Sequence, residues 1–145
     1  IAQAKAYLDS KGIAYLEKTG NTAGEILEAV SGMIGRVDAV FTPTDNAVMA
    51  TEATVAETLA GAGIPHYTGA DSFVAAGAFA TSGVNYTDLG TKTADMAMDI
   101  LAGGEIPAYH VMEGGIITVN TDTAAALGLD ITPLRSMAGT IVEVS

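Results

Sequence analysis

Residues 37–46, VDAVFTPTDN, carry the pattern on which the fold prediction rests. Residues 37–42 include Val37, Val40 and Phe41 and predict a strand, and Pro43 ends it because proline cannot donate to a backbone ladder. Asp45 then has the residue type of a helix N-cap, and residues 46–59 predict a helix. The segment is therefore one strand, one polar turn and one helix in succession.

The same unit recurs along the chain. We predict further strands at 13–17, 64–68, 78–81 and 116–119, an extended stretch at 111–112, and helices at 1–8, 22–34, 71–76, 87–101 and 121–127. Thr22 with Glu25 matches a capping box, Asp71 with Ser72 can begin the short fourth helix, and Thr87 can cap the fifth. Strands that alternate with helices at this spacing predict the α/β class: three αβα layers around a mainly parallel sheet covered on both faces.

Length and composition limit what the chain can be. At 145 residues, 49% hydrophobic and 16% charged, residues 1–145 are expected to form one compact domain. Six Lys and Arg against 17 Asp and Glu give a net charge of −11, which argues against nucleic acid or an anionic membrane surface as a partner. The absence of cysteine excludes disulfides, thiolate metal sites and a cysteine nucleophile.

The sequence also carries few signs of catalysis. It contains no GxGxxG, GxxxxGK[ST] or GxSxG motif, so the nucleotide-binding and nucleophile-elbow signatures are missing. His66 and His110 are the two histidines, and neither belongs to a metal-ligand spacing, so we expect a structural or partly exposed role for each and not a catalytic one. We therefore predict a protein that is not an enzyme, with no catalytic residue, no cofactor and no metal.

Three polar loops follow predicted strands, at 42–46, 69–72 and 82–86. If the strands are parallel, these loops meet at one edge of the sheet, where such folds bind ligands. Carboxylates there can pair with a ligand ammonium, and hydroxyl, amide and helix N-terminal groups can bind a ligand carboxylate, which together suit a zwitterion. The candidate ligand-binding residues are Thr44, Asp45, Asn46, Asp71, Ser72, Asn85 and Tyr86.

Simpler roles exist for these side chains. Asp45 and Asp71 could act only as helix caps, which would occupy each carboxylate with backbone N–H groups. Tyr86 could stack on a ligand or pack against the helix that follows it. The residue pattern alone leaves both choices open.

At these loops the sequence resembles the substrate-binding proteins of ABC importers, in particular the group associated with tryptophan and tyrosine. The matching runs are 37–46, 64–65, 69–72, 77–78, 83–86, 89–90 and 93–97. The resemblance implies a type I periplasmic-binding fold, in which two α/β lobes close over a solute and deliver it to a permease. The resemblance implies that Asp45, Asn46 and Asp71 contact the solute. Thr44, Ser72 and Asn85 are the next candidates for such contacts.

The resemblance also implies what surrounds this chain. It corresponds to the carboxyl-terminal lobe, begins inside that lobe's first helix without an initiator Met, and leaves residues 87–108 as the segment that crosses toward the first lobe. The expected partners are a small solute, an aromatic or apolar amino acid, and ABC permease subunits, with a homodimer formed through the orphaned crossover segment. The expected location is extracytoplasmic, in the periplasm or lipid-anchored at the cell surface, with the signal segment outside this sequence.

Two other functional classes share this architecture. A ligand-sensing effector domain of a transcription regulator would need a DNA-binding segment outside residues 1–145. An enzyme on a doubly wound sheet could use Asp45 or Asp71 as a base or metal ligand.

Overall fold

The computed structural model describes residues 1–112, 114–137 and 139–145. Within them one sheet has five strands in the order β1-β2-β3-β4-β5, namely β1 (Val40–Thr42), β2 (His66–Thr68), β3 (Ala80–Gly83), β4 (Ile116–Asn120) and β5 (Thr140–Val144). Strands β1, β2 and β3 are parallel, β4 runs antiparallel to β3, and β5 is parallel to β4. The mainly parallel α/β sheet is confirmed.

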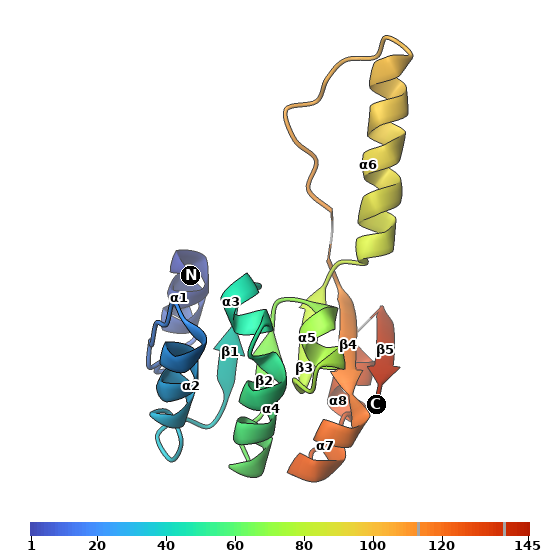
Figure 1. The fold of residues 1–145 in the computed structure, drawn as a ribbon. Coiled ribbons are helices and arrows are strands. Elements are labelled where there is room, and N and C mark those ends of the chain that lie inside the picture. The colour runs from blue at the N-terminus through green and yellow to red at the C-terminus, as the bar shows by residue number, and fades with distance from the viewer. Residues whose placement is uncertain (113, 138) are drawn as a thin grey trace.

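Helices lie between and beside these strands (Figure 1). They are α1 (Ala2–Ser10), α2 (Ala23–Ser31), α3 (Asn46–Met49), α4 (Glu52–Gly61), α5 (Asp71–Ala75), α6 (Tyr86–Leu101), α7 (Thr121–Leu127) and α8 (Thr132–Met137). Figure 1 shows α4, α5 and α7 against one face of the sheet, where they contact β2, β3, β4 and β5. No helix in the described residues is long and apolar enough to cross a membrane.

The main core lies between α2, α4 and the sheet. It contains the buried side chains Ile26, Val30, Val40, Val55, Leu59 and Ile64. A second cluster joins β3 and β4 to α7 through Phe79, Ala80, Val119 and Ala124. On the other face, at β1 and β2, the cover is thinner than expected: Phe41 is 58% exposed and Tyr67 is 38% exposed.

Two predicted helix starts are confirmed by their hydrogen bonds. The Thr22 hydroxyl accepts from the Glu25 N–H, while the Glu25 carboxylate accepts from the Asn21 N–H. At α3, one Asp45 oxygen accepts from the N–H groups of Ala47 at 2.7 Å and Val48 at 3.2 Å. Both caps are local patterns, so the order of residues is enough to predict them.

The predictions of two other helix starts were wrong. The N-cap of α6 is Asn85, not Thr87, and its side-chain oxygen accepts from the N–H of residues 87 and 88. The N-cap of α5 is Ala70, and the Asp71 carboxylate accepts from the Ser72 N–H directly beside it. Asparagine is a favoured capping residue, so the sequence signal at Asn85 was present but the cap was assigned to a neighbour.

Several element boundaries also differ from expectation. Residues 13–20 form no strand, because strand propensity produces a strand only where a sheet edge pairs its backbone. The predicted helix 46–59 is split into α3 and α4 at Thr51, whose hydroxyl bonds the Val48 carbonyl and competes with the helix ladder. The stretch 111–112 is not a strand, and α2 ends at Ser31. Helix α8 and strand β5 were not predicted.

Helix α6 stands away from the rest of the chain (Figure 1). None of its described residues is buried, and Met98 and Leu101 are 65% and 81% exposed. The chain then returns beside it, so that His110 and Ile100 help line a hollow on the α6 surface. The segment therefore lies outside the core of the described structure.

This difference in packing can be measured with a matched pair of leucines. Leu59→Ala empties a fully buried position in α4 and should lower the free energy of unfolding by about 2 to 5 kcal/mol. Leu101→Ala, at the exposed end of α6, should change it by less than about 0.5 kcal/mol. Urea unfolding followed by circular dichroism measures both, and equal losses would show that α6 belongs to the core.

Candidate functional site

The sheet brings the three predicted loops to one edge. Parallel pairing of Thr42 with Thr68, and of Thr68 with Thr81, places the carboxyl ends of β1, β2 and β3 side by side. Because β4 is antiparallel to β3, its first residue, Ile116, lies opposite Gly83 at the same edge. The geometric part of the prediction is confirmed.

The loop after β1 presents Thr44, Asp45 and Asn46, which are all exposed. Both capping bonds of Asp45 end on the same oxygen, Oδ1, so the cap does not use Oδ2. The carboxylate can therefore cap α3 and still accept a hydrogen bond from a cationic group.

The loop after β2 lies directly against the loop after β1. A methyl group at Gly69 would lie 2.5 Å from the Thr44 hydroxyl and 2.9 Å from the Thr44 backbone nitrogen. Only a residue without a side chain fits this approach, which holds Asp71 and Ser72 on the same edge as Asp45. Asp71 and Ser72 are both exposed.

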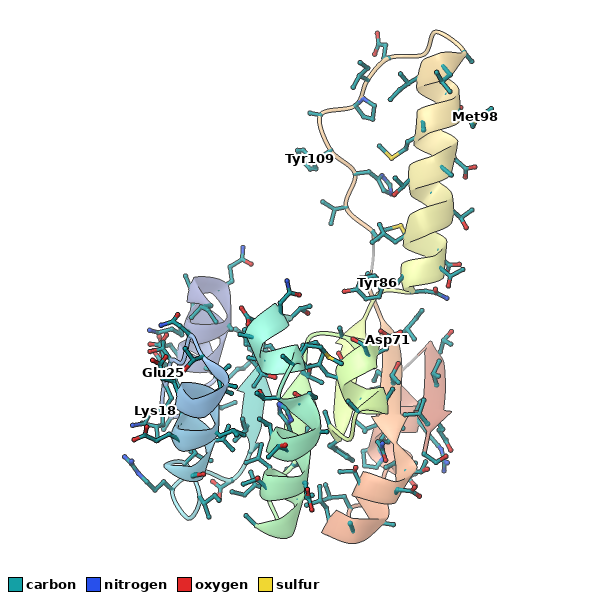
Figure 2. All side chains as sticks on the ribbon, in the orientation of Figure 1. Lys18, Glu25, Asp71, Tyr86, Met98 and Tyr109 are labelled. Carbon is teal, nitrogen blue, oxygen red and sulfur yellow. The ribbon has the colours of Figure 1, made fainter. Side chains whose placement is uncertain are left out.

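The loop after β3 leads into α6. The Asn85 side-chain oxygen caps this helix, with distances of 2.8 Å and 3.2 Å to the N–H groups of residues 87 and 88. Tyr86 is 50% exposed, so it is not packed into the helix surface as a core residue would be. Figure 2 shows Asp71 and Tyr86 at the same edge of the sheet, close to the point where α6 leaves it.

This edge is open. All seven predicted ligand-binding residues lie at the surface, and two hollows in the described residues lie elsewhere, one beside α1 and one on α6. The carboxylate, hydroxyl and amide groups of these seven residues therefore form an open surface at this sheet edge, which we call the shelf. Such a shelf offers groups for both ends of a zwitterion but does not enclose it.

Sequence reasoning missed a row of three polar side chains that leads from the interior to the end of β1. Glu52 and His66 are 1% and 2% exposed, and Glu52 Oε1 lies 3.1 Å from His66 Nδ1. The other ring nitrogen, Nε2, lies 2.9 Å from the Thr42 hydroxyl at the end of β1. The structural role predicted for His66 agrees with this burial, but a glutamate on an Ala-rich helix gave no sign that it would be buried.

The described residues contain no group of three or more His, Asp or Glu side chains placed to hold a metal ion. His110 is exposed beside α6, far along the chain from the loops of the sheet edge.

Comparison with known proteins identifies the family. Residues 1–137 match the family described as ABC transporter substrate binding protein. This chain belongs to that family. The match covers the whole sheet edge, from the loop after β1 to β4.

Individual relatives agree with this assignment. A tyrosine-binding protein from Clostridioides difficile (strain R20291) is 31% identical over 126 residues, which cover 85% of this chain and 36% of that protein. A solved structure of an ABC domain in complex with L-Trp from Streptococcus pneumonia superposes with a TM-score of 0.82 at 26% identity. It aligns with 97% of this chain and 49% of its own length.

Two further solved structures show the same partial coverage. A conserved domain protein from Vibrio cholerae has a TM-score of 0.82 at 25% identity, over 97% of this chain and 48% of its own. A ligand-free, open substrate binding protein with adhesive properties from Clostridium difficile has a TM-score of 0.73 at 30% identity, over 99% and 49%. The chain thus spans about half the length of these solved relatives.

The contact between the two loops can be tested at Gly69. Gly69→Ala places a methyl group against the Thr44 backbone and should destabilise the protein by about 1 to 3 kcal/mol, the cost typical of overpacking. Gly83→Ala is the matched control, because its methyl group would meet its nearest neighbours at 3.8 Å and 3.9 Å. Thermal unfolding of both variants measures the difference, and equal stability would contradict the close approach.

Proposed function

We propose that this chain is the carboxyl-terminal lobe of a two-lobed solute-binding protein, which captures an aromatic or other apolar amino acid for an ABC permease. The observation that carries the proposal is the open shelf, where Asp45 and Asp71 are exposed beside hydroxyl and amide groups on one sheet edge. Membership of a substrate-binding family supports binding over the regulatory and enzymatic alternatives. The tyrosine and L-Trp named for two relatives support an aromatic amino acid.

Each part of the shelf has a role in this proposal. The Asp45 and Asp71 carboxylates bind the ligand ammonium, and Thr44, Asn46 and Ser72 bind its carboxylate. Asn85 and Tyr86 lie toward the side chain, where the Tyr86 ring offers an apolar surface. The residues bind and orient the solute, and no covalent bond is made or broken.

The solute then acts by shifting the population of lobe arrangements. A ligand that contacts both lobes binds the closed arrangement more tightly than the open one, so binding favours closure. The closed form would be the one that the permease receives. Such a protein works outside the cytoplasm, in the periplasm or anchored at the cell surface.

Residues 87–108 are proposed to cross to the first lobe. The support is that α6 leaves the sheet at the shelf and carries the exposed Met98 side chain away from the core (Figure 2). Leu101, the last residue of α6, is also exposed. When the first lobe is absent, the same surface is proposed to pair two copies of this chain.

Calorimetry with an amino-acid panel tests the function, using the complete protein that carries this chain. We expect L-tryptophan or L-tyrosine to bind with a dissociation constant in the micromolar range or below. A dissociation constant of about 1 μM corresponds to a binding free energy of about −8 kcal/mol. No heat from any amino acid would refute the proposal.

Asp45 can be tested separately as ligand and as cap. Asp45→Asn keeps an oxygen that can cap α3 but removes the charge, so it should weaken binding by about 2 kcal/mol with little change in melting temperature. Asp45→Ala removes both, and should also lower stability by about 1 kcal/mol. Unchanged affinity in Asp45→Asn would leave Asp45 with the capping role alone.

The isolated 145-residue chain tests the crossover segment. Size-exclusion chromatography with light scattering should show a dimer, and Met98→Glu with Leu101→Glu should convert it to a monomer because charges are costly in an apolar contact. Met137→Glu is the control, since Met137 is 75% exposed on α8, away from this segment. A monomer at high protein concentration, or a dimer that survives the double substitution, would contradict the proposed pairing.

A further inference from the structure

A line of polar groups runs from the interior to the shelf. It begins at Glu52 on α4, passes through the His66 ring on β2 and ends at the Thr42 hydroxyl on β1, with separations of 3.1 Å and 2.9 Å. Three elements between residues 40 and 68, namely β1, α4 and β2, thus contribute one member each. Thr42 directly precedes Pro43 and the ligand-binding candidates Thr44 and Asp45.

Burial restricts the charge that this line can carry. The side chains of His66 and Glu52 are 2% and 0% exposed, and within the described residues neither glutamate oxygen has a well-aligned hydrogen bond. The Nδ1 and Oε1 atoms are within ion-pair distance but poorly aligned, so their contact is chiefly electrostatic. A single uncompensated charge in such a place is strongly unfavourable, whereas a pair with zero net charge is tolerated.

A net charge of zero limits the positions that the hydrogens of the Glu52–His66 pair can take. The pair is neutral as imidazolium with carboxylate, or as neutral imidazole with a carboxylic acid whose hydrogen faces an unprotonated Nδ1. In both forms His66 Nε2 carries a hydrogen and donates it to the Thr42 oxygen. A neutral pair with the ring hydrogen on Nδ1 and a carboxylic acid on Glu52 would have Nε2 accept from the Thr42 hydroxyl instead, but it leaves the buried acid hydrogen without an acceptor among the described residues.

From this arrangement we infer that the buried Glu52–His66 pair is a positioning device for the ligand loop, and that it holds Thr42 as a hydrogen-bond acceptor from His66 Nε2. The Thr42 hydroxyl hydrogen is then directed away from His66 and is available to the loop of residues 43–46 or to the carboxylate of a bound amino acid. The inference rests on the proposed function, because it assigns the pair to the amino-acid site. Glu52 and His66 act through Thr42 and do not touch the ligand.

Nitrogen-15 NMR of the histidine rings tests the bonding pattern without any ligand. At about pH 7, where histidine protonation is most sensitive to its surroundings, long-range proton–nitrogen correlation should show a protonated Nε2 in His66. His110 is exposed and provides a second ring in the same spectrum, and His66→Gln assigns the signals. An unprotonated, acceptor-type Nε2 in His66 would overturn the inference.

Binding of L-tryptophan and L-tyrosine tests the positioning role in the complete protein. Thr42→Val should weaken binding about fivefold or more, and Thr42→Ser should restore most of it, because serine keeps the hydroxyl. Glu52→Leu combined with His66→Leu replaces the whole pair by apolar side chains, a change that commonly preserves folding. It should weaken binding as much as Thr42→Val, and combining all three changes should add little.

These experiments separate the inference from the function on which it rests. If the double variant Glu52→Leu, His66→Leu is folded by its melting temperature and binds as tightly as the unaltered protein, the positioning role is overturned. Absence of binding by the unaltered protein, together with a protonated Nε2, would refute the proposed function and leave the bonding pattern standing. Binding with an unprotonated Nε2 would overturn the inference and leave the proposed function standing.

Discussion

Parallel pairing of β1, β2 and β3 is the constraint on which the rest of this structure depends. Parallel neighbours cannot be joined by a tight turn, so each connection must cross the sheet, and here α4 and α5 lie in those crossings. Their apolar faces form the core with the sheet. The same geometry brings the loops that follow β1, β2 and β3 to one edge, which makes the shelf a consequence of the fold.

The titratable side chains near this sheet edge lie in two different environments. The acids of the shelf, Asp45 and Asp71, are exposed, where water and a cationic ligand can both reach them. Glu52 and His66 lie within the interior and compensate each other at 3.1 Å. Exposed carboxylates can respond to a ligand, whereas the Glu52–His66 contact is shielded from water, and the Thr42 hydroxyl connects the two environments.

Helix α6 is not stabilised by the hydrophobic core that α2 and α4 form with the sheet. The apolar side chains of α6 are not part of the core. Leu101 at the end of α6 and Tyr109 in the segment after it expose apolar surface that another protein surface could bury. The chain also spans about half the length of the solved relatives that it matches. Both observations support the proposal that residues 87–108 cross to another lobe.

The sequence by itself determined the features that depend on neighbours along the chain. Hydrophobic runs, the capping residues Thr22 and Asp45, and the loops 42–46 and 69–72 predicted the α/β class and the location of the candidate site. Only the tertiary structure decided the absence of a strand at 13–17, the pairing of β5 with β4, and the burial of Glu52 against His66. The reason is physical: a helix cap is satisfied within a few residues, but a strand needs a partner edge and a buried charge needs a compensating group, which the fold supplies from distant parts of the chain.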